Sequence, residues 1–170
     1  MENIKEVGVI DILPTALYFF EKVHPLYIQL AEDEKKVYSS LLGKKKKAEA
    51  AKNGYERAIK LSIQAASKIL DIRPYAVKAA KDYANSILNL YNLHDQMVVS
   101  RINVLKMFIS EGLTDRVKDY NQNVSLKICS NYDTHYAIMN QQTLNYCQMF
   151  TMMGPFKDIH EVLDTLNKNR

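Results

Sequence analysis

The chain has 170 residues, which suits a single domain that buries roughly 70% of the surface its unfolded form exposes. With 47% apolar and 25% charged residues, but only five glycines and four prolines, it is too hydrophobic to be disordered and too poor in turn residues for a β-sandwich or barrel. The net charge of +4 is unevenly spread, because residues 44–81 carry eleven basic and only three acidic side chains.

The N-terminal sequence has neither the basic start nor the apolar stretch of a secretory signal, and no uncharged segment is long enough to cross a bilayer. We therefore expect a soluble, cytoplasmic protein. Cys129 and Cys147 are 18 residues apart, or about 27 Å along one helix, so we expect two reduced thiols that do not bridge each other.

We expect residues 1–13 to form an extended or irregular lead-in, because they offer only five apolar residues: Val7, Val9, Ile10, Ile12 and Leu13. Pro14 suits the first turn of a helix, which then continues with apolar residues at helical spacing. Pro25 falls inside this pattern and removes one backbone hydrogen bond. It should either kink the helix or separate residues 14–24 as a short piece.

Residues 26–72 allow two topologies. Apolar residues keep helical phase across Gly43, which favours one long helix, whereas Gly43 itself is a usual helix stop and allows two helices turned back on each other. Phase continuity favours the single helix. The seam residues on this reading are Val37, Leu41, Ala48, Ala51, Tyr55, Ile59, Ile63, Ala66 and Leu70.

Asp71–Pro74 is the clearest boundary, because a residue before proline is driven out of the helical region and proline suits a helix start. The next helix should reach Gly112 without interruption and carry an apolar stripe wide enough for two neighbours. The stripe consists of Ala80, Tyr83, Ala84, Ile87, Leu90, Tyr91, His94, Met97, Val98, Ile102, Leu105 and Ile109.

Gly112 and Thr114 predict a helix stop followed by an N-cap, so the last long helix should run back antiparallel to its predecessor. Its predicted seam is more polar than the previous one, and a short helix over residues 156–168 should cap one end. The seam consists of Val117, Asn121, Val124, Ile128, Tyr132, His135, Met139, Tyr146, Phe150 and Met153.

These elements predict an all-α protein: one domain over residues 1–170, built as an elongated antiparallel bundle of three to four long helices with coiled-coil-like packing. Folding the chain back at Gly112 places His135 level with Tyr91, and His94 level with Tyr132. We interpret these four residues as a buried polar layer that sets helix register, rather than as a metal site.

Other combinations that could carry chemistry have less support. Glu21 and His24 have the spacing of a di-iron motif, but that site needs two copies and only one is present, which favours a surface pair. Cys129 or Asp133 would be the additional ligand if the buried layer bound a metal. We expect no cofactor and no metal.

The basic segment 44–60 is the most distinctive candidate for binding. Its cations are Lys44, Lys45, Lys46, Lys47, Lys52, Arg57 and Lys60. Four consecutive lysines cannot share one helix face, so a solvated loop or belt is the simplest explanation, and phosphate binding is the functional one. No aromatic residue lies within the lysine run, so contact with nucleic acid would not depend on sequence.

No phosphate loop, nucleophile elbow or zinc motif is present, so we do not expect an enzyme. We expect an interaction or assembly module that forms homo-oligomers or docks a protein partner along its helix faces. The wide stripe before Gly112 and the methionine-rich end at Met149, Met152 and Met153 motivate this interpretation. The alternative is a binder of nucleic acid or anionic membrane through residues 44–60.

Overall fold

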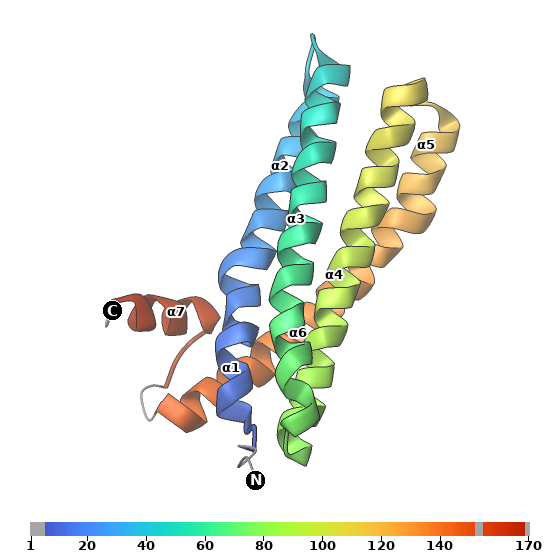
Figure 1. Cartoon of the computed structure of the whole chain (residues 1–170). Helices are drawn as coiled ribbons and strands as arrows, with labels where there is room; N and C mark the ends of the chain where they lie inside the picture. The colour runs from blue at the N-terminus through green and yellow to red at the C-terminus, as the bar shows by residue number, and fades with distance from the viewer. Residues whose placement is uncertain (1–5, 152–154, 169–170) are drawn as a thin grey trace.

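The computed structural model describes residues 6–151 and 155–168, and it confirms the all-α fold (Figure 1). Five long helical stretches account for most of the chain, and two of them contain a π-helical turn. The elements are α1 (Val9–Tyr18), η1 (Phe19–Val23), α2 (His24–Ser39), α3 (Lys44–Ile72), η2 (Arg73–Tyr75), α4 (Lys78–Glu111), α5 (Asp115–Tyr120), η3 (Asn121–Ser125), α6 (Leu126–Thr151) and α7 (Ile159–Lys168).

The first helix begins at Val9, five residues before the start expected at Pro14, so the irregular lead-in is shorter than predicted. Asp11 supports this early start, because its carboxylate accepts a hydrogen bond from the backbone N–H of Gly8 at 2.9 Å. Pro14 lies inside α1 rather than at its beginning. The apolar residues of this segment are covered, since Ile12 and Leu13 are both buried.

Pro25 neither breaks nor separates the rod formed by α1, η1 and α2. The π-helical turn η1 precedes it directly, and the N–H of His24 donates to the carbonyl of Phe19, five residues back. A π-turn contains one extra residue, and such turns occur where the usual ladder is interrupted. The ladder is thus rearranged next to the proline, and the helix continues to Ser39.

The chain reverses at Gly43, so the single long helix favoured by the sequence is wrong and the two-helix alternative holds. Gly43 has φ 70° and ψ 26°, a left-handed conformation that glycine adopts without steric cost. The helical spacing of apolar residues continues across the turn because α2 and α3 each direct an apolar side toward the same core. Leu41, counted in the predicted seam, is instead 97% exposed at the turn.

Helix α3 confirms its predicted seam at Ala48, Ala51 and Tyr55 but departs from it farther along. Beyond Tyr55 its buried residues are small ones with a single isoleucine at the end, whereas Ile63 and Leu70 are 56% and 46% exposed. Small side chains let α3 approach α4 closely, which larger residues would prevent. The buried positions are Ala58, Ser62, Ala65 and Ile69.

Helix α4 confirms its predicted stripe, since every residue named for it is buried except Ile109, which is half-buried. The turn before it is completed by the N-terminus, because Val7 pairs with Ala76 in an isolated bridge. Gly112 closes the helix with φ 76°, and the Thr114 hydroxyl accepts a bond from the Val117 N–H at 3.4 Å, as the sequence predicted.

A second π-turn, η3, interrupts the last rod, and the predicted seam of that rod is confirmed only in part. The predicted seam position Val124 is 40% exposed and His135 is only half-buried, whereas Ser125 is fully buried. Farther along the rod, Thr143 and Cys147 are buried although the predicted seam did not include them. Tyr132 and Met139 are buried as predicted.

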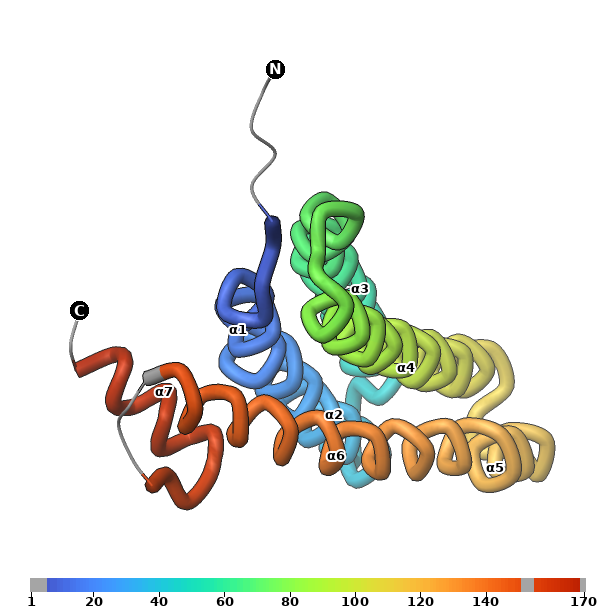
Figure 2. The backbone as a smooth tube through the Cα atoms, turned by 90° about the horizontal axis from the view of Figure 1, so that it is seen from below, coloured from blue at the N-terminus to red at the C-terminus, as the bar shows by residue number. Residues whose placement is uncertain are grey.

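The helical stretches surround two groups of buried residues. One lies toward the termini and joins α1, α4, α6 and α7, and the other lies toward the α2–α3 turn. Figure 2 shows α6 passing obliquely across the other helices, with α7 folded back beside its end. Helix α7 starts three residues later than predicted, and it packs on the core through the buried side chains of Ile159 and Val162. Of the three methionines at the predicted methionine-rich end, Met149 is exposed. Met152 and Met153, the latter also a predicted seam position, lie outside the described residues.

Candidate interaction surface

The turn between α2 and α3 carries the most exposed apolar residues of the described chain. Leu41 is 97% and Leu42 is 83% exposed, and the two are adjacent in sequence. In Figure 1 this turn stands at one end of the molecule, away from both termini. Ser40 ends α2 in an extended conformation and left-handed Gly43 starts α3, so two backbone constraints hold the leucines at the apex.

The lysine run forms the first turn of α3, immediately after the apex. Lys45, Lys46 and Lys47 are exposed, and Lys44 is half-buried. The first turn contains no acidic residue and no side chain caps it. The N-terminus of a helix has a partial positive charge that favours anions, so four cations here oppose the helix dipole. A negatively charged partner would relieve this repulsion.

The four lysines have few partners inside the molecule. Lys47 Nζ donates to the Ser40 hydroxyl at 3.0 Å, across the turn. Among the residues that the structure describes, no acidic side chain forms an ion pair with any lysine of the run. Their charge therefore remains directed toward solvent.

The other predicted cations lie farther down α3. Lys52 pairs with Glu49 at 3.3 Å, while Arg57 and Lys60 are exposed. Lys60 is 16 residues beyond Lys44, or about 24 Å along the helix. The structure thus gathers Lys44–Lys47 at the turn and distributes the remaining three cations along one helix.

An open groove of about 470 Å³ runs below the turn, between α2 and α3. Its floor forms where the helices approach closely: a Cβ added at Gly54 would lie 2.5 Å from Leu30 Cδ2. Cationic side chains from both helices line it, together with Asp33. These cations are Lys36, Lys47 and Arg57. Lys36 extends the positive charge of the turn to α2.

The predicted polar layer is assembled only in part. His94 and Tyr132 are both fully buried, with ring centroids 6.1 Å apart. Tyr91 is buried on the same stripe and donates to the Thr15 carbonyl at 3.2 Å. His135 lies outside this cluster, and its Nδ1 is 3.0 Å from the Asn131 carbonyl of its own helix.

His24, rather than His135, is the second histidine that packs against Tyr132. Its Nδ1 lies 2.7 Å from the Tyr132 hydroxyl, and its ring stacks on Tyr136 at 4.0 Å between centroids. Burial, followed by the charges of His94 and His160, lowers the pKa of His24 to about 4. The sequence interpretation left His24 at the surface, because nothing in the local pattern indicated that η1 would rotate it toward α6.

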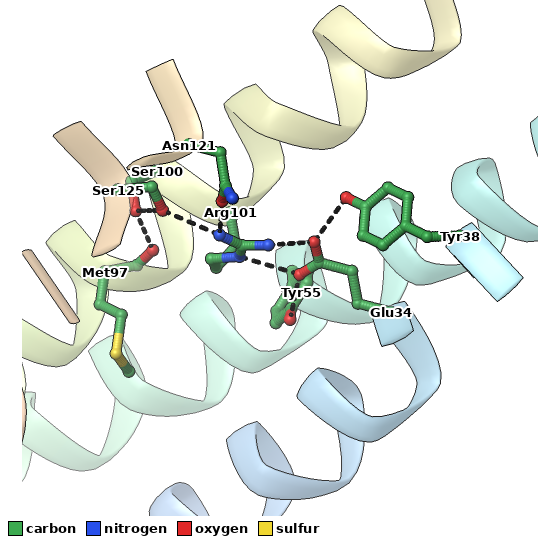
Figure 3. A network of polar contacts seen from close by, with 8 residues as sticks. All are labelled: Glu34, Tyr38, Tyr55, Met97, Ser100, Arg101, Asn121 and Ser125. Carbon is green, nitrogen blue, oxygen red and sulfur yellow. Dashed lines mark hydrogen bonds and ion pairs between the residues drawn. The ribbon is translucent and has the colours of Figure 1, made fainter. Parts of the chain in front are cut away.

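A buried network around Glu34 and Arg101 was not predicted (Figure 3). Glu34 on α2 is 2% exposed, and it forms a two-pronged ion pair with Arg101 on α4. The hydroxyls of Tyr38 and Tyr55 donate to its two carboxylate oxygens at 2.6 and 2.8 Å.

Arg101 links this carboxylate to η3. Its guanidinium also donates to Asn121 Oδ1 and to the Ser125 hydroxyl. Burial alone would lower the pKa of Arg101, but the hydrogen bonds and charge of Glu34 outweigh it and raise the pKa above its ordinary value. The network therefore joins α2, α3, α4 and η3, because the ion pair of Glu34 and Arg101 forms hydrogen bonds with side chains from all of these elements.

No group of three or more histidine, cysteine, aspartate or glutamate side chains among the described residues could hold a metal ion. Nor is any helix of that part of the chain both long and apolar enough to cross a membrane. No family model, no curated protein and no solved structure matches the chain.

Proposed function

We propose that this protein is a non-catalytic docking module that attaches to a negatively charged partner through the tip of its α2–α3 hairpin, residues 36–47. One observation carries the proposal: four lysines occupy the uncapped first turn of α3, unpaired and next to two exposed leucines. An arrangement that opposes the helix dipole is hard to explain by folding stability. It is well suited to raising the encounter rate with an anionic surface.

The interior favours a structural role for the buried polar groups. Glu34, Arg101 and the hydroxyls around them bond to one another. Such closed networks fix the arrangement of helices. The hairpin tip is then held on a rigid support, which is what a docking element requires.

The test measures binding of the full chain to two anionic probes, a DNA duplex and acidic lipid vesicles, over a range of salt concentrations. We expect binding to at least one probe, falling steeply with salt, and lost when Lys44–Lys47 are all replaced by Gln. A charge-matched control replaces Lys22, Lys81, Lys127 and Lys157, which are exposed on other elements, by Gln. Equal losses in the two variants, or no salt-dependent binding at all, would refute the proposal.

A second candidate function is self-association along α3. Ile59, Ile63, Ala66 and Leu70 follow each other at spacings of four, three and four residues, which is the spacing of a coiled-coil seam, and Ile63 and Leu70 are exposed. A second copy of the chain offers the same stripe. Sedimentation at micromolar concentration should then reveal a dimer that Ile63→Glu with Leu70→Glu dissociates, and a monomer at every concentration would exclude it.

A further inference from the structure

We infer that the partner of the hairpin tip is an anionic lipid bilayer, into which Leu41 and Leu42 insert while the adjacent lysines contact the headgroups. This inference rests on the proposed function and names the chemistry of its partner. It commits to a membrane surface because two exposed leucines at the turn are followed directly in sequence by four lysines in the first turn of α3. The turn itself stands at one end of the molecule (Figure 1).

The leucines supply the first step of the argument. Turns between helices are usually made of small or polar residues, which water solvates easily. Here two adjacent leucines are 97% and 83% exposed at the end of the molecule, and neither belongs to one of its buried apolar clusters. The free energy of such side chains falls when they move from water into an apolar environment.

The position of the charges supplies the second step. Lys44–Lys47 form the first turn of α3, so their backbone lies within about 6 Å of the apex measured along the helix axis. Lys36 reaches the same region from α2. Leucines placed 5–10 Å into the boundary between headgroups and acyl chains would bring these amines level with the phosphates, in the usual arrangement of interfacial segments.

The size of the tip separates a bilayer from the other anionic partners. A specific protein interface buries about 800 Å² on each partner, which two leucines and a short lysine run do not provide. A nucleic-acid backbone offers no apolar surface for the leucines, and residues 36–47 contain no arginine. Their one aromatic residue, Tyr38, is half-buried, bonds to Glu34 and packs on Phe108, so it is not presented to bases. A bilayer accepts both features without a shaped counterpart.

The chain contains no tryptophan, so a single one reports directly on its own surroundings. In the full chain, Leu41→Trp should show a blue shift of emission, and quenching by brominated lipid, on phosphatidylcholine vesicles that contain phosphatidylserine but not on phosphatidylcholine alone. Leu70→Trp is the matched control, since Leu70 is 46% exposed but lies about 39 Å from Lys44 along α3. It should show neither effect.

Affinity measurements separate the contribution of the leucines from that of the lysines. Leu41→Ser with Leu42→Ser should weaken binding to phosphatidylserine vesicles by about 10- to 100-fold, whereas Leu70→Ser leaves it unchanged. Each lysine of the run replaced by Gln should weaken binding roughly fivefold. Circular dichroism identifies any variant that fails to fold, and the affinities of the folded variants, together with the quenching of Leu41→Trp, then decide the question.

The outcomes distinguish the inference from the proposal on which it rests. Vesicle binding with a blue shift at position 41 supports both. Salt-dependent binding to DNA, or to vesicles without a blue shift and without any effect of the leucine substitutions, overturns bilayer insertion but leaves electrostatic docking intact. Absence of binding to either probe overturns both.

Discussion

At the scale of single residues, the Glu34–Arg101 pair is the most costly feature of the interior. Moving two charges out of water is unfavourable, and only close geometry with further hydrogen bonds compensates for it. Here Tyr38, Tyr55 and Asn121 provide those bonds. Such a pair is sensitive to the loss of one partner, because the remaining charge stays buried.

Truncation of Glu34 to Ala should therefore lower the free energy of unfolding by about 3–5 kcal/mol, as seen by chemical denaturation. The control is Glu32→Ala, whose side chain is 57% exposed and pairs with Lys35, and it should cost less than about 1 kcal/mol. Replacing both Glu34 and Arg101 by leucine should recover part of the loss. If Glu34→Ala were no worse than Glu32→Ala, the carboxylate would not be closing the network.

The sequence did not reveal this pair, for a physical reason. Glu34 and Arg101 are 67 residues apart, and each taken alone resembles an ordinary surface charge on a helix. Helical periodicity offers a weak signal, since Glu34 falls four residues after Leu30 and three before Val37, both buried. Its partner could be identified only once α2 and α4 were known to be neighbours.

At the scale of elements, the two helix-reversing glycines differ in how strictly they require glycine. Gly43 has φ 70° and ψ 26°, a left-handed helical conformation that asparagine also tolerates. Gly112 combines φ 76° with ψ −161°, a region that essentially only glycine occupies. Neither would meet a clash with neighbouring atoms if it carried a Cβ, so the backbone alone sets the difference.

We expect Gly43→Ala to lower the free energy of unfolding by about 1 kcal/mol and Gly112→Ala by about 2–3 kcal/mol. Gly43→Asn should restore most of the stability, whereas Gly112→Asn should be as harmful as alanine. Thermal and urea unfolding of the four variants provide the comparison. Equal costs at the two positions would contradict the backbone explanation.

At the scale of the whole molecule, the aromatic and histidine cluster joins the N-terminal rod to α6, which makes global stability depend on pH. His24 is held neutral between Tyr132 and Tyr136. Its pKa falls from the ordinary 6.5 to about 4, mainly through burial. The unfolded chain therefore binds a proton at a higher pH than the folded one does.

Stability contributed by neutral His24 should be complete above pH 6.5 and lost as pH falls toward about 4. We expect a loss on the order of 2 kcal/mol across this window, measured as the free energy of urea unfolding at a series of pH values. The variant His24→Phe keeps an aromatic ring but cannot titrate, so its stability should decline less over the same window. An unchanged decline would assign the effect to other groups.

The sequence by itself determined the helical class, the breaks at residues 74 and 112, and the buried stripe of α4. Glycine, proline and apolar spacing act within one helix, and each of these features depends on local backbone and surface properties alone. Tyr132 and His94 could be paired in advance because a short turn at Gly112 makes neighbouring helices antiparallel.

Only the tertiary structure decided the reversal at Gly43, the exposed side of α3 and the residues that follow η3. Apolar phase is the same whether a helix continues or folds back, so it could not reveal the hairpin. A π-turn adds one residue to the hydrogen-bond ladder, which spacing measured at 3.6 residues per turn does not register, and η1 comes just before His24, whose ring packs on Tyr132 and Tyr136. Contact between distant helices, rather than the pattern of either one, selects which stripe is covered.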